Sequence, residues 1–510
     1  MKTLRLILGD QLNQKHSWFE SVDKNMVYLM AEMRQETDYV KHHIQKVTAF
    51  FQAMRNFHQE LSEKGHCFIY LKINDPENPQ NLDQILPKYI DITEAAKFEY
   101  QLPDEYRLDL QIKTICSNLS VESNVVDTEH FFTSRYELKN FFSGKKTLVM
   151  ESFYRMMRKK HGILMMNDQP EGGQWNFDKS NRKKWNGEPE IPHERGFRKD
   201  VSAILDEIEK AGIQTFGTIE AENLSWPTCR ADCLSALNYF CKHLLVHFGD
   251  FQDALHTEEK FLFHSRLSFA MNSKMISPKE VIDKVLEHYY AHRDEIHISQ
   301  IEGFTRQILG WREYMRGMYW KEMPEYATLN ELKNENPLPD FFWTGETKMN
   351  CLKHSIGQSL ENAYAHHIQR LMIIGNFALL CQVDPQLVDA WYLGVYIDAI
   401  EWVELMNTRG MSQFADGGLV ATKPYVSSAN YINKMGNYCS ECHYQHTKKT
   451  GKKACPFNAL YWNFLDEKKE FFIHNQRMNM MMSLLQKKNT EELKALKKRA
   501  KEIISNPNQY

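Results

Sequence analysis

The sequence has no long apolar run and no amino-terminal secretory leader. The longest apolar stretch, residues 371–383, is interrupted by Gly375 and Asn376 and is shorter than the roughly 20 residues needed to cross a bilayer. Residues 1–5 lead directly into a strand-like segment, without the apolar tract and cleavage site of a signal peptide. We therefore expect a cytoplasmic protein that does not associate with membranes.

An excess of charge of one sign is also missing. Sixty-three Lys and Arg residues face 66 Asp and Glu residues, for a formal charge of −3, so any nucleic-acid site must be a local patch. The ten cysteines lie in a 510-residue chain without a signal peptide, which favours reduced thiols, and clustered ones are better interpreted as metal ligands than as disulfides. This length predicts two unequal domains.

The first 130 residues alternate strand-like and helix-like patterns. Strand-like segments cover 4–8, 27–30 and 67–71, and a polar helix is expected over 38–64. This alternation predicts parallel β/α units, in which ligands bind beyond the carboxyl ends of the strands. The turns at Gly9-Asp10 and Ala31-Glu32 are therefore candidates for lining a pocket. No G-x-G-x-x-G follows the first strand, so the ordinary dinucleotide fingerprint is missing.

The remainder of the chain predicts a linker and then helices. Residues 165–199 are rich in Gly, Pro, Asn and Asp, with little periodicity. Beyond residue 205 apolar spacing of three and four is typical of helices, for example over 282–292, 364–381 and 385–406. We expect an α/β domain over 1–133, a linker over 134–205 and an all-helical domain over 206–510, with a basic surface helix over 487–501.

Two groups of cations are candidate contacts to a phosphate backbone, and a solvated surface is the alternative. Those in and before the linker are Arg155, Arg158, Lys159, Lys160, Arg182, Lys183 and Lys184, with Trp185 beside them. The second group is Lys448, Lys449, Lys452 and Lys453.

A cysteine cluster is the sharpest chemical signal. Cys439 and Cys442 are three residues apart, so one turn can present both thiolates to a metal centre, and Cys455 follows with a proline after it. Cysteine followed by proline is typical of ferredoxin-type iron–sulfur ligands. A 4Fe-4S cluster needs a fourth thiolate, for which Cys351 in a polar loop-to-helix junction is preferred to Cys381, which ends an apolar helix. Structural zinc is the competing interpretation.

Several motifs together resemble the photolyase and cryptochrome family. The segment 305–314, TRQILGWREY, resembles the family's Q-x-x-x-W-R-E-F signature. Residues 265–268, SRLS, resemble its S-x-L-S turn, and residues 365–370, AHHIQR, resemble its H-H-x-x-R helix. The cysteine set and the opening LGDQL at 8–12 resemble the iron–sulfur branch, the bacterial cryptochromes and prokaryotic (6-4) photolyases.

This resemblance implies a Rossmann-like antenna domain followed by an all-α FAD-binding domain. It also implies light-driven repair of (6-4) photoproducts in UV-damaged DNA by a monomer, through an electron from excited reduced FAD. Repair requires a hydroxyl to return between bases, so a proton donor is needed, and His367 beside His366 matches that role because imidazole has a pKa of about 6.5. The alternatives are a blue-light photoreceptor with the same chromophores and no repair, and a zinc-stabilised nucleic-acid binder without flavin.

The resemblance also implies a role for each matching residue. The expected FAD contacts are Ser265, Arg266, Leu267 and Ser268 at the diphosphate, Trp311 and Arg312 along the cavity, Arg370 and Asp398 flanking the ring, and Glu404 near flavin N5. The expected electron-transfer residues are Trp343, Trp391 and Tyr392. The expected cluster ligands are Cys351, Cys439, Cys442 and Cys455. The expected antenna is 6,7-dimethyl-8-ribityllumazine near Asp10 and Glu32, and Asp178 is a candidate ligand for Mg²⁺.

Overall fold

The computed structural model describes residues 1–145, 148–193 and 195–510. Its amino-terminal part is a five-stranded, fully parallel sheet in the order β4-β2-β1-β5-β6. The strands are β1 (Lys2–Leu6), β2 (Met26–Ala31), β4 (Cys67–Leu71), β5 (Ala95–Gln101) and β6 (Glu122–Val126). The predicted parallel β/α domain is therefore confirmed.

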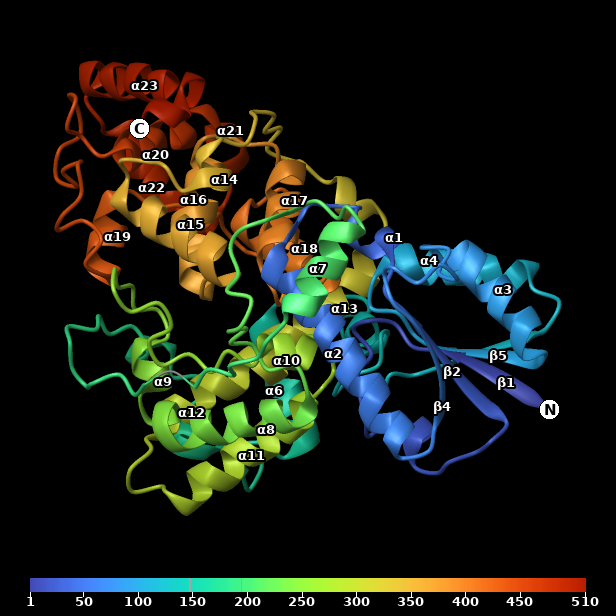
Figure 1. Cartoon of the computed structure of the whole chain (residues 1–510). Helices are drawn as coiled ribbons and strands as arrows, with labels where there is room; N and C mark the ends of the chain where they lie inside the picture. Colours follow the sequence, from blue (N-terminus) through green and yellow to red (C-terminus); the bar gives the residue numbers. More distant parts are fainter. Residues whose placement is uncertain (146–147, 194) are drawn as a thin grey trace.

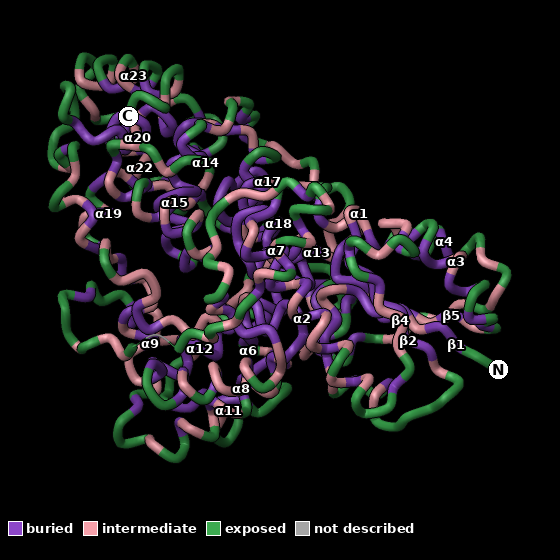
Figure 2. The backbone as a smooth tube through the Cα atoms, viewed as in Figure 1, coloured by how far each residue is buried: buried purple, intermediate pink, exposed green. Residues whose placement is uncertain are grey.

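The two faces of this sheet pack in two different hydrophobic cores. Successive side chains of a strand point to opposite faces, so Leu29 of β2 packs in a core with α3 (Leu82–Thr93) and α4 (Tyr106–Asn118), whereas Tyr28 and Met30 pack in a core with α2 (Ile44–Glu63). The core around α2 continues into the helical part of the molecule. Helix α2 thus lies between the sheet and the helical part of the molecule, and its buried residues join the core of that part (Figures 1 and 2).

The rest of the chain is largely helical, as predicted. Its only named strand in the described part after residue 205 is β9 (Thr215–Phe216), which pairs with β3 (His42–His43) and ties the two parts together. The longer helices there are α8 (Arg230–Tyr239), α11 (Pro278–Ala291), α12 (Ile298–Thr305), α13 (Glu313–Glu322), α15 (Asn350–Asn362), α17 (Pro385–Val395), α20 (Pro456–Glu467), α22 (Asn479–Gln486) and α23 (Thr490–Ser505). The shorter ones are α9 (Leu245–Phe251), α10 (Ser268–Asn272), α14 (Phe341–Thr344), α16 (Asn376–Leu380), α18 (Glu401–Leu405), α19 (Ala429–Met435) and α21 (Lys469–Phe472).

The segment predicted as a linker carries secondary structure of its own. It contains α5 (Glu137–Phe141), α6 (Met150–His161), α7 (Ser202–Lys210) and a hairpin of β7 (Met165–Met166) with β8 (Gln169–Pro170). Residues 146, 147 and 194 of this segment lie outside the described part. A further short helix, α1 (Arg34–Thr37), follows β2. None of the helices in the described ranges is long and apolar enough to cross a membrane.

Two predicted helices are interrupted in the structure. The pattern over 364–381 begins as a turn and becomes helical only at His367, and the pattern over 385–406 is broken between Val395 and Glu401. Asp398 lies in the second break, not on a helix, and its backbone carbonyl accepts a hydrogen bond from the Asn272 amide (2.6 Å). The apolar spacing continues through the break, which is why periodicity alone could not detect it.

Candidate functional site

A cavity of about 540 Å³ lies in the helical domain, within the usual range for small-molecule and cofactor sites. Segments far apart in the sequence line it: the 265–268 turn, the π-helical segment Arg306–Arg312, the turn before α16, and the chain from α17 to α18. The predicted residues that line it are Ser265, Arg266, Leu267, Ser268, Trp311, Arg312, His366, His367, Arg370, Tyr392, Asp398 and Glu404. Trp343, Trp391 and the four predicted cysteine ligands are not among its lining residues.

A buried ion pair crosses this cavity. The Arg370 guanidinium donates to both carboxylate oxygens of Asp398, at 2.9 and 3.2 Å, and lies 3.7 Å from the ring centroid of Tyr396. The Ser268 hydroxyl donates to the same carboxylate at 2.6 Å. Burial works to raise the pKa of Asp398, but Arg370 and Ser268 outweigh it and hold that pKa below its usual value. The pair therefore remains charged at neutral pH.

The 265–268 turn is shaped by its own contacts. Arg266 has a φ of 55°, and its guanidinium stacks over Trp226 (4.5 Å) and Phe261 (4.0 Å). The Leu267 amide donates to the Ser265 hydroxyl at 3.4 Å. Because Ser268 already donates to Asp398, its hydroxyl orients the ion pair, which differs from the phosphate contact expected from the sequence.

Several buried polar atoms of the cavity have no partner among the described residues. They are Nε2 of His264, Nδ1 of His366, Nε of Arg312 and Oε1 of Glu404. Burial, together with Asp389 nearby, raises the pKa of Glu404 well above its usual value, which favours the protonated form of this carboxyl. Buried polar groups are ordinarily paired, so these atoms fit a polar ligand with several hydrogen-bonding groups, as the isoalloxazine and ribityl parts of FAD provide.

Three histidines gather at one side of the cavity. The rings of His264 and His366 stack at 4.7 Å between centroids, with planes 15° apart. Burial lowers the pKa of His264 to about 4, with His367 adding to the effect, and burial lowers the pKa of His367 to about 4, with Arg370 adding to the effect. His264 was missed in the sequence, although it directly precedes the SRLS segment.

We predict that His264 makes the protein sensitive to acid. Below its ordinary pKa of 6.5 the unfolded chain binds a proton at His264, whereas the folded chain does so only near pH 4. The free energy of unfolding therefore falls as the pH drops through this interval, by roughly 3 kcal/mol at pH 4 for this one group. His264→Gln should make the decline shallower by about that amount in thermal or urea unfolding between pH 7 and 4. The variant keeps the neighbouring charged and titratable groups His366, His367 and Arg370. If the free energy of unfolding falls between pH 7 and 4 as steeply as in the unmodified protein, the prediction is contradicted.

The three predicted electron-transfer residues differ in their exposure to solvent and in their contacts. Trp343 is 42% exposed, whereas Trp391 and Tyr392 are buried. Trp391 donates its indole N–H to the Phe342 carbonyl at 3.0 Å, its ring lies 5.4 Å from that of Tyr392, and Tyr392 lines the cavity. Trp391 and Tyr392 are therefore in ring contact beside the cavity, whereas the ring of Trp343 contacts that of Phe216, with centroids 5.1 Å apart.

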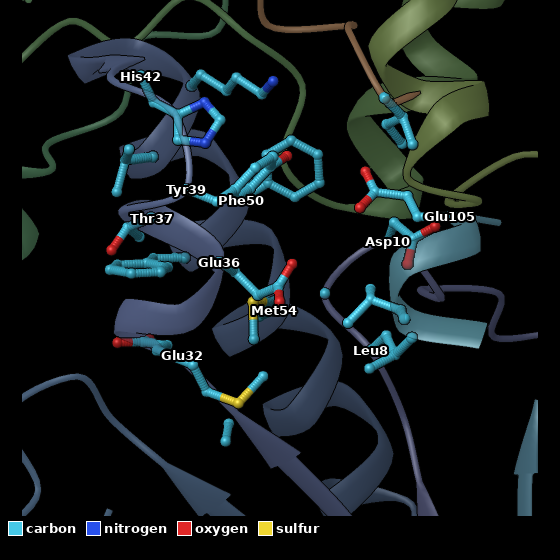
Figure 3. Close-up of a pocket in the computed structure, with 18 of the residues that line it drawn as sticks. Leu8, Asp10, Glu32, Glu36, Thr37, Tyr39, His42, Phe50, Met54 and Glu105 are labelled. Carbon is cyan, nitrogen blue, oxygen red and sulfur yellow. The ribbon is translucent and has the colours of Figure 1, made fainter. Parts of the chain in front are cut away.

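A second, smaller cavity of about 130 Å³ lies between the domains (Figure 3). It opens beside the carboxyl ends of β1 and β5, where the strand order reverses and open α/β sheets bind ligands. Asp10 and Glu105 lie on one side of it, and Thr37 and His42 lie on the other (Figure 3). Its volume is slightly below that of an apolar cavity of about 150 Å³ that accepts benzene.

The polar residues of this smaller cavity differ in what they can offer. Glu32 lines it, but its carboxylate already binds the Arg55 guanidinium at 2.7 and 2.9 Å and the Tyr70 hydroxyl at 2.7 Å. Asp10 pairs with Lys274 at 2.8 Å. His42 is buried, and neither of its ring nitrogens has a partner among the described residues. His42 is therefore a better candidate for ligand contact than Glu32, although no sequence pattern indicated it.

The four cysteines chosen from the sequence approach one another. Cys351 is the second residue of α15, Cys455 directly precedes α20, and Cys439 and Cys442 lie in the turn between α19 and α20. Burial raises the pKa of the Cys351 thiol, and the charges of Cys455, Cys439 and Cys442 add to this. Burial alone acts on the pKa of Cys381, which is raised without any contribution from another cysteine.

These thiols are near but not in contact with a common point. Among the described residues no group of three or more His, Cys, Asp or Glu side chains could hold a single metal ion. The Tyr444 amide donates to Sγ of Cys442 at 3.4 Å, a type of contact that tunes iron–sulfur clusters.

The predicted cation patches are only partly available at the surface. Arg158 is fully buried and donates to the carbonyls of Ile163 (3.2 Å) and Trp175 (3.0 Å), and Trp185 is also buried. These two are structural, contrary to the sequence-based expectation. Asp178 pairs with Arg306 at 3.2 Å and also with Arg182, so its charge is already balanced without Mg²⁺. Lys448, Lys449, Lys452 and Lys453 are all exposed.

Comparison with solved structures defines the class of fold. The chain superimposes on a bacterial class III photolyase from Agrobacterium tumefaciens with a TM-score of 0.56, at 15% identity, covering 83% of this chain and 81% of that one. It superimposes equally well on a Synechocystis cryptochrome, with a TM-score of 0.56 at 12% identity over 82% of each chain. The fold is therefore the one that photolyases and cryptochromes share.

Comparison with known sequences gives the family. Residues 5–224 match the family model described as "Deoxyribodipyrimidine photo-lyase-related protein". A protein from Agrobacterium fabrum named "(6-4) photolyase" is 42% identical over 481 residues, which are 94% of either chain. An uncharacterized protein of Acanthamoeba polyphaga mimivirus is 36% identical over 123 residues, 24% of this chain and 93% of that protein. The chain belongs to the photolyase family.

Proposed function

We propose that this protein is a (6-4) photolyase, which repairs (6-4) pyrimidine–pyrimidone photoproducts in UV-damaged DNA. The observation that carries the proposal is that His366 and His367 lie in the same cavity as the Arg370 and Asp398 ion pair. A proton-donating group and the residues expected around a flavin therefore line the same cavity. The 42% identity to a protein named (6-4) photolyase supports the same reaction.

FAD is the proposed cofactor of the 540 Å³ cavity, and when bound it would supply the electron that light makes available for repair. Arg370 and Asp398 would hold and orient the ring, and Trp311 and Arg312 would line the space around it. When its carboxyl is protonated, Glu404 would donate a hydrogen bond to an acceptor in the cavity. Trp343, Trp391 and Tyr392 would carry electrons from the surface to this space.

His367 would supply the proton that accompanies repair. Because the pKa of His367 lies at about 4 before DNA binds, its imidazole is neutral at pH 7 and must first gain a proton before it can act as a general acid. A DNA phosphate entering the cavity mouth would raise the pKa of this histidine by placing a negative charge beside it. Photolyases are among the enzymes that flip their target nucleotides out of the duplex into an active-site pocket, and such flipping would bring the lesion to this histidine.

The four cysteines would hold a 4Fe-4S cluster. Their free thiols, their mutual proximity and the backbone donor at Cys442 support this proposal. Structural zinc is the alternative, and iron and sulfide analysis of the purified protein distinguishes the two. Lys448, Lys449, Lys452 and Lys453, in the exposed loop between two of the cysteines, would contact the DNA backbone.

A lumazine antenna is the proposed ligand of the smaller cavity, and His42 offers a test. His42→Phe removes both ring nitrogens and keeps a planar ring, so we expect antenna occupancy to fall about tenfold, the loss of one buried hydrogen-bonding group. Occupancy is read from the flavin-to-lumazine ratio after extraction, or from energy transfer to the flavin. Gln59→Leu, an exposed change on the same α2 helix, should leave the ratio unchanged. Full occupancy in His42→Phe would exclude this contact.

The function itself is tested with reduced protein and a UV-damaged oligonucleotide under blue light. We expect the absorption of the (6-4) product to disappear with time, and the purified protein to show flavin and iron–sulfur absorption. Photoreduction without any loss of the (6-4) absorption would identify a photoreceptor instead. A colourless protein would contradict the flavin assignment altogether.

A further inference from the structure

A buried glutamine holds the turn that carries the two cavity histidines. The helix begins at His367, and the side-chain oxygen of Gln369 accepts a hydrogen bond from the backbone N–H of His366 at 3.0 Å. A side chain two or three residues into a helix that bonds back to the residue before it fixes the entry angle of the chain. The position of His366 and His367 therefore depends on where the Gln369 amide lies.

The other end of the same amide is held from the cysteine region. Gln369 donates from Nε2 to Oε1 of Gln358 on α15 at 2.9 Å, and to the Tyr438 hydroxyl at 3.0 Å. Gln369 and Tyr438 are both buried, at 2% and 0% exposure. A buried polar group that loses its hydrogen-bond partner is left unsatisfied, at a cost in free energy. If the Tyr438 phenol moves, the Gln369 amide must therefore move with it or lose this hydrogen bond.

Tyr438 is in turn fixed to two of the proposed cluster ligands. It directly precedes Cys439, and its backbone carbonyl accepts from the side-chain amide of Asn350, the neighbour of Cys351, at 3.0 Å. Its ring is parallel to that of His354 on the same α15 helix, 5.8 Å away with planes 13° apart. Tyr438 is therefore held by contacts to the helix that carries Cys351 and by its chain connection to Cys439.

We infer that Tyr438 and Gln369 connect the cysteine cluster to the histidine turn, so that an intact cluster positions His366 and His367 for the lesion. This rests on the proposed function. Tyr438 and Gln369 are positioning residues, because they act through the backbone at His366. The cluster would then have a structural role in the repair site that requires no electron transfer through it. Loss of the cluster would weaken the contacts that hold His366 and His367 through Tyr438 and Gln369.

The test is Tyr438→Phe, which removes one oxygen atom and keeps the ring packed beside His354. We expect repair by the reduced protein to fall about three- to tenfold, as for one buried hydrogen bond, with FAD and iron content unchanged. Amide hydrogen exchange in a peptide covering residues 364–370 should become faster by a similar factor. Gln369→Met, which loses all three contacts, should accelerate exchange further. Exchange is measured independently of repair, so it reports the turn itself.

Tyr461→Phe is the matched control. Tyr461 is another buried tyrosine, on the helix that follows Cys455, and burial raises its pKa to about 12 as it does for Tyr438. Its hydroxyl contacts Sδ of Met481, not the histidine turn, so exchange at 364–370 should match the unmodified protein.

Removing iron from the unmodified protein with an oxidant and a chelator gives a second arm. It should also accelerate exchange at 364–370. Unchanged exchange in Tyr438→Phe, or after iron removal, would overturn the inference. Faster exchange in both, in a protein that repairs no DNA, would support the connection and reject the proposed function.

Discussion

Replacing His367 with Asn should abolish most of the repair activity while the protein keeps its FAD. Asn is smaller than His and keeps a polar side chain, but it cannot act as a general acid, and such proton transfer contributes about 10²- to 10⁴-fold to a rate. His367 lines the cavity without carrying any of the ion-pair contacts that hold Asp398. The measurement is the rate of (6-4) product loss per absorbed photon in the fully reduced enzyme.

Two controls separate chemistry from folding in this experiment. Flavin absorption and thermal stability should be unchanged in His367→Asn. His288→Asn, on α11 and outside the cavity, should repair at the normal rate. Repair within about twofold of normal in His367→Asn would show that the proton comes from elsewhere, and His366 would be the next candidate because it lines the same cavity.

Replacing Asp398 with Asn should cost the protein both stability and flavin. The change leaves the Arg370 guanidinium in the cavity without its carboxylate, and breaking a buried pair in this way costs about 3 kcal/mol or more. Part of Arg370 faces the open cavity, with 21% of its side chain exposed, so we expect the lower end of that range. The readouts are the midpoint of urea unfolding and the ratio of bound FAD to protein.

A double replacement tests whether the Arg370 and Asp398 ion pair contributes more to FAD binding than to the stability of the fold. Arg370→Met combined with Asp398→Leu removes both charges, and a buried pair replaced by apolar groups is often neutral for stability. We therefore expect stability to return close to normal in the double variant while FAD binding stays lost. Full FAD occupancy in either variant would show that the pair does not flank the cofactor.

Local patterns predicted much of this molecule. The alternation of apolar strands and polar helices in the first 130 residues predicted the parallel sheet, and turns after two strands indicated the edge where the smaller cavity lies. The spacing of Cys439, Cys442 and Cys455 and the polar setting of Cys351 predicted four thiols that do lie close together. Each of these signals depends on residues near one another in the chain or on a fixed repeat.

Other features depend on contacts that no local pattern contains. Asp398 lies in a break between two helices because Arg370, Ser268 and Asn272 bind it from other segments. Arg158 was expected at the surface from its basic neighbours, but the carbonyls of the following loop bury it.

The sequence by itself determined the fold class, and its family resemblance supplied the candidate residues that line the large cavity. Only the tertiary structure decided that His264 joins the histidines, that Glu32 is already occupied by Arg55, and that Tyr438 reaches Gln369. The physical reason is that periodicity and motif spacing indicate which secondary structure the backbone adopts and which face of a helix or strand is buried. The hydrogen-bond partner of a buried polar group is chosen by whichever distant segment packs against it.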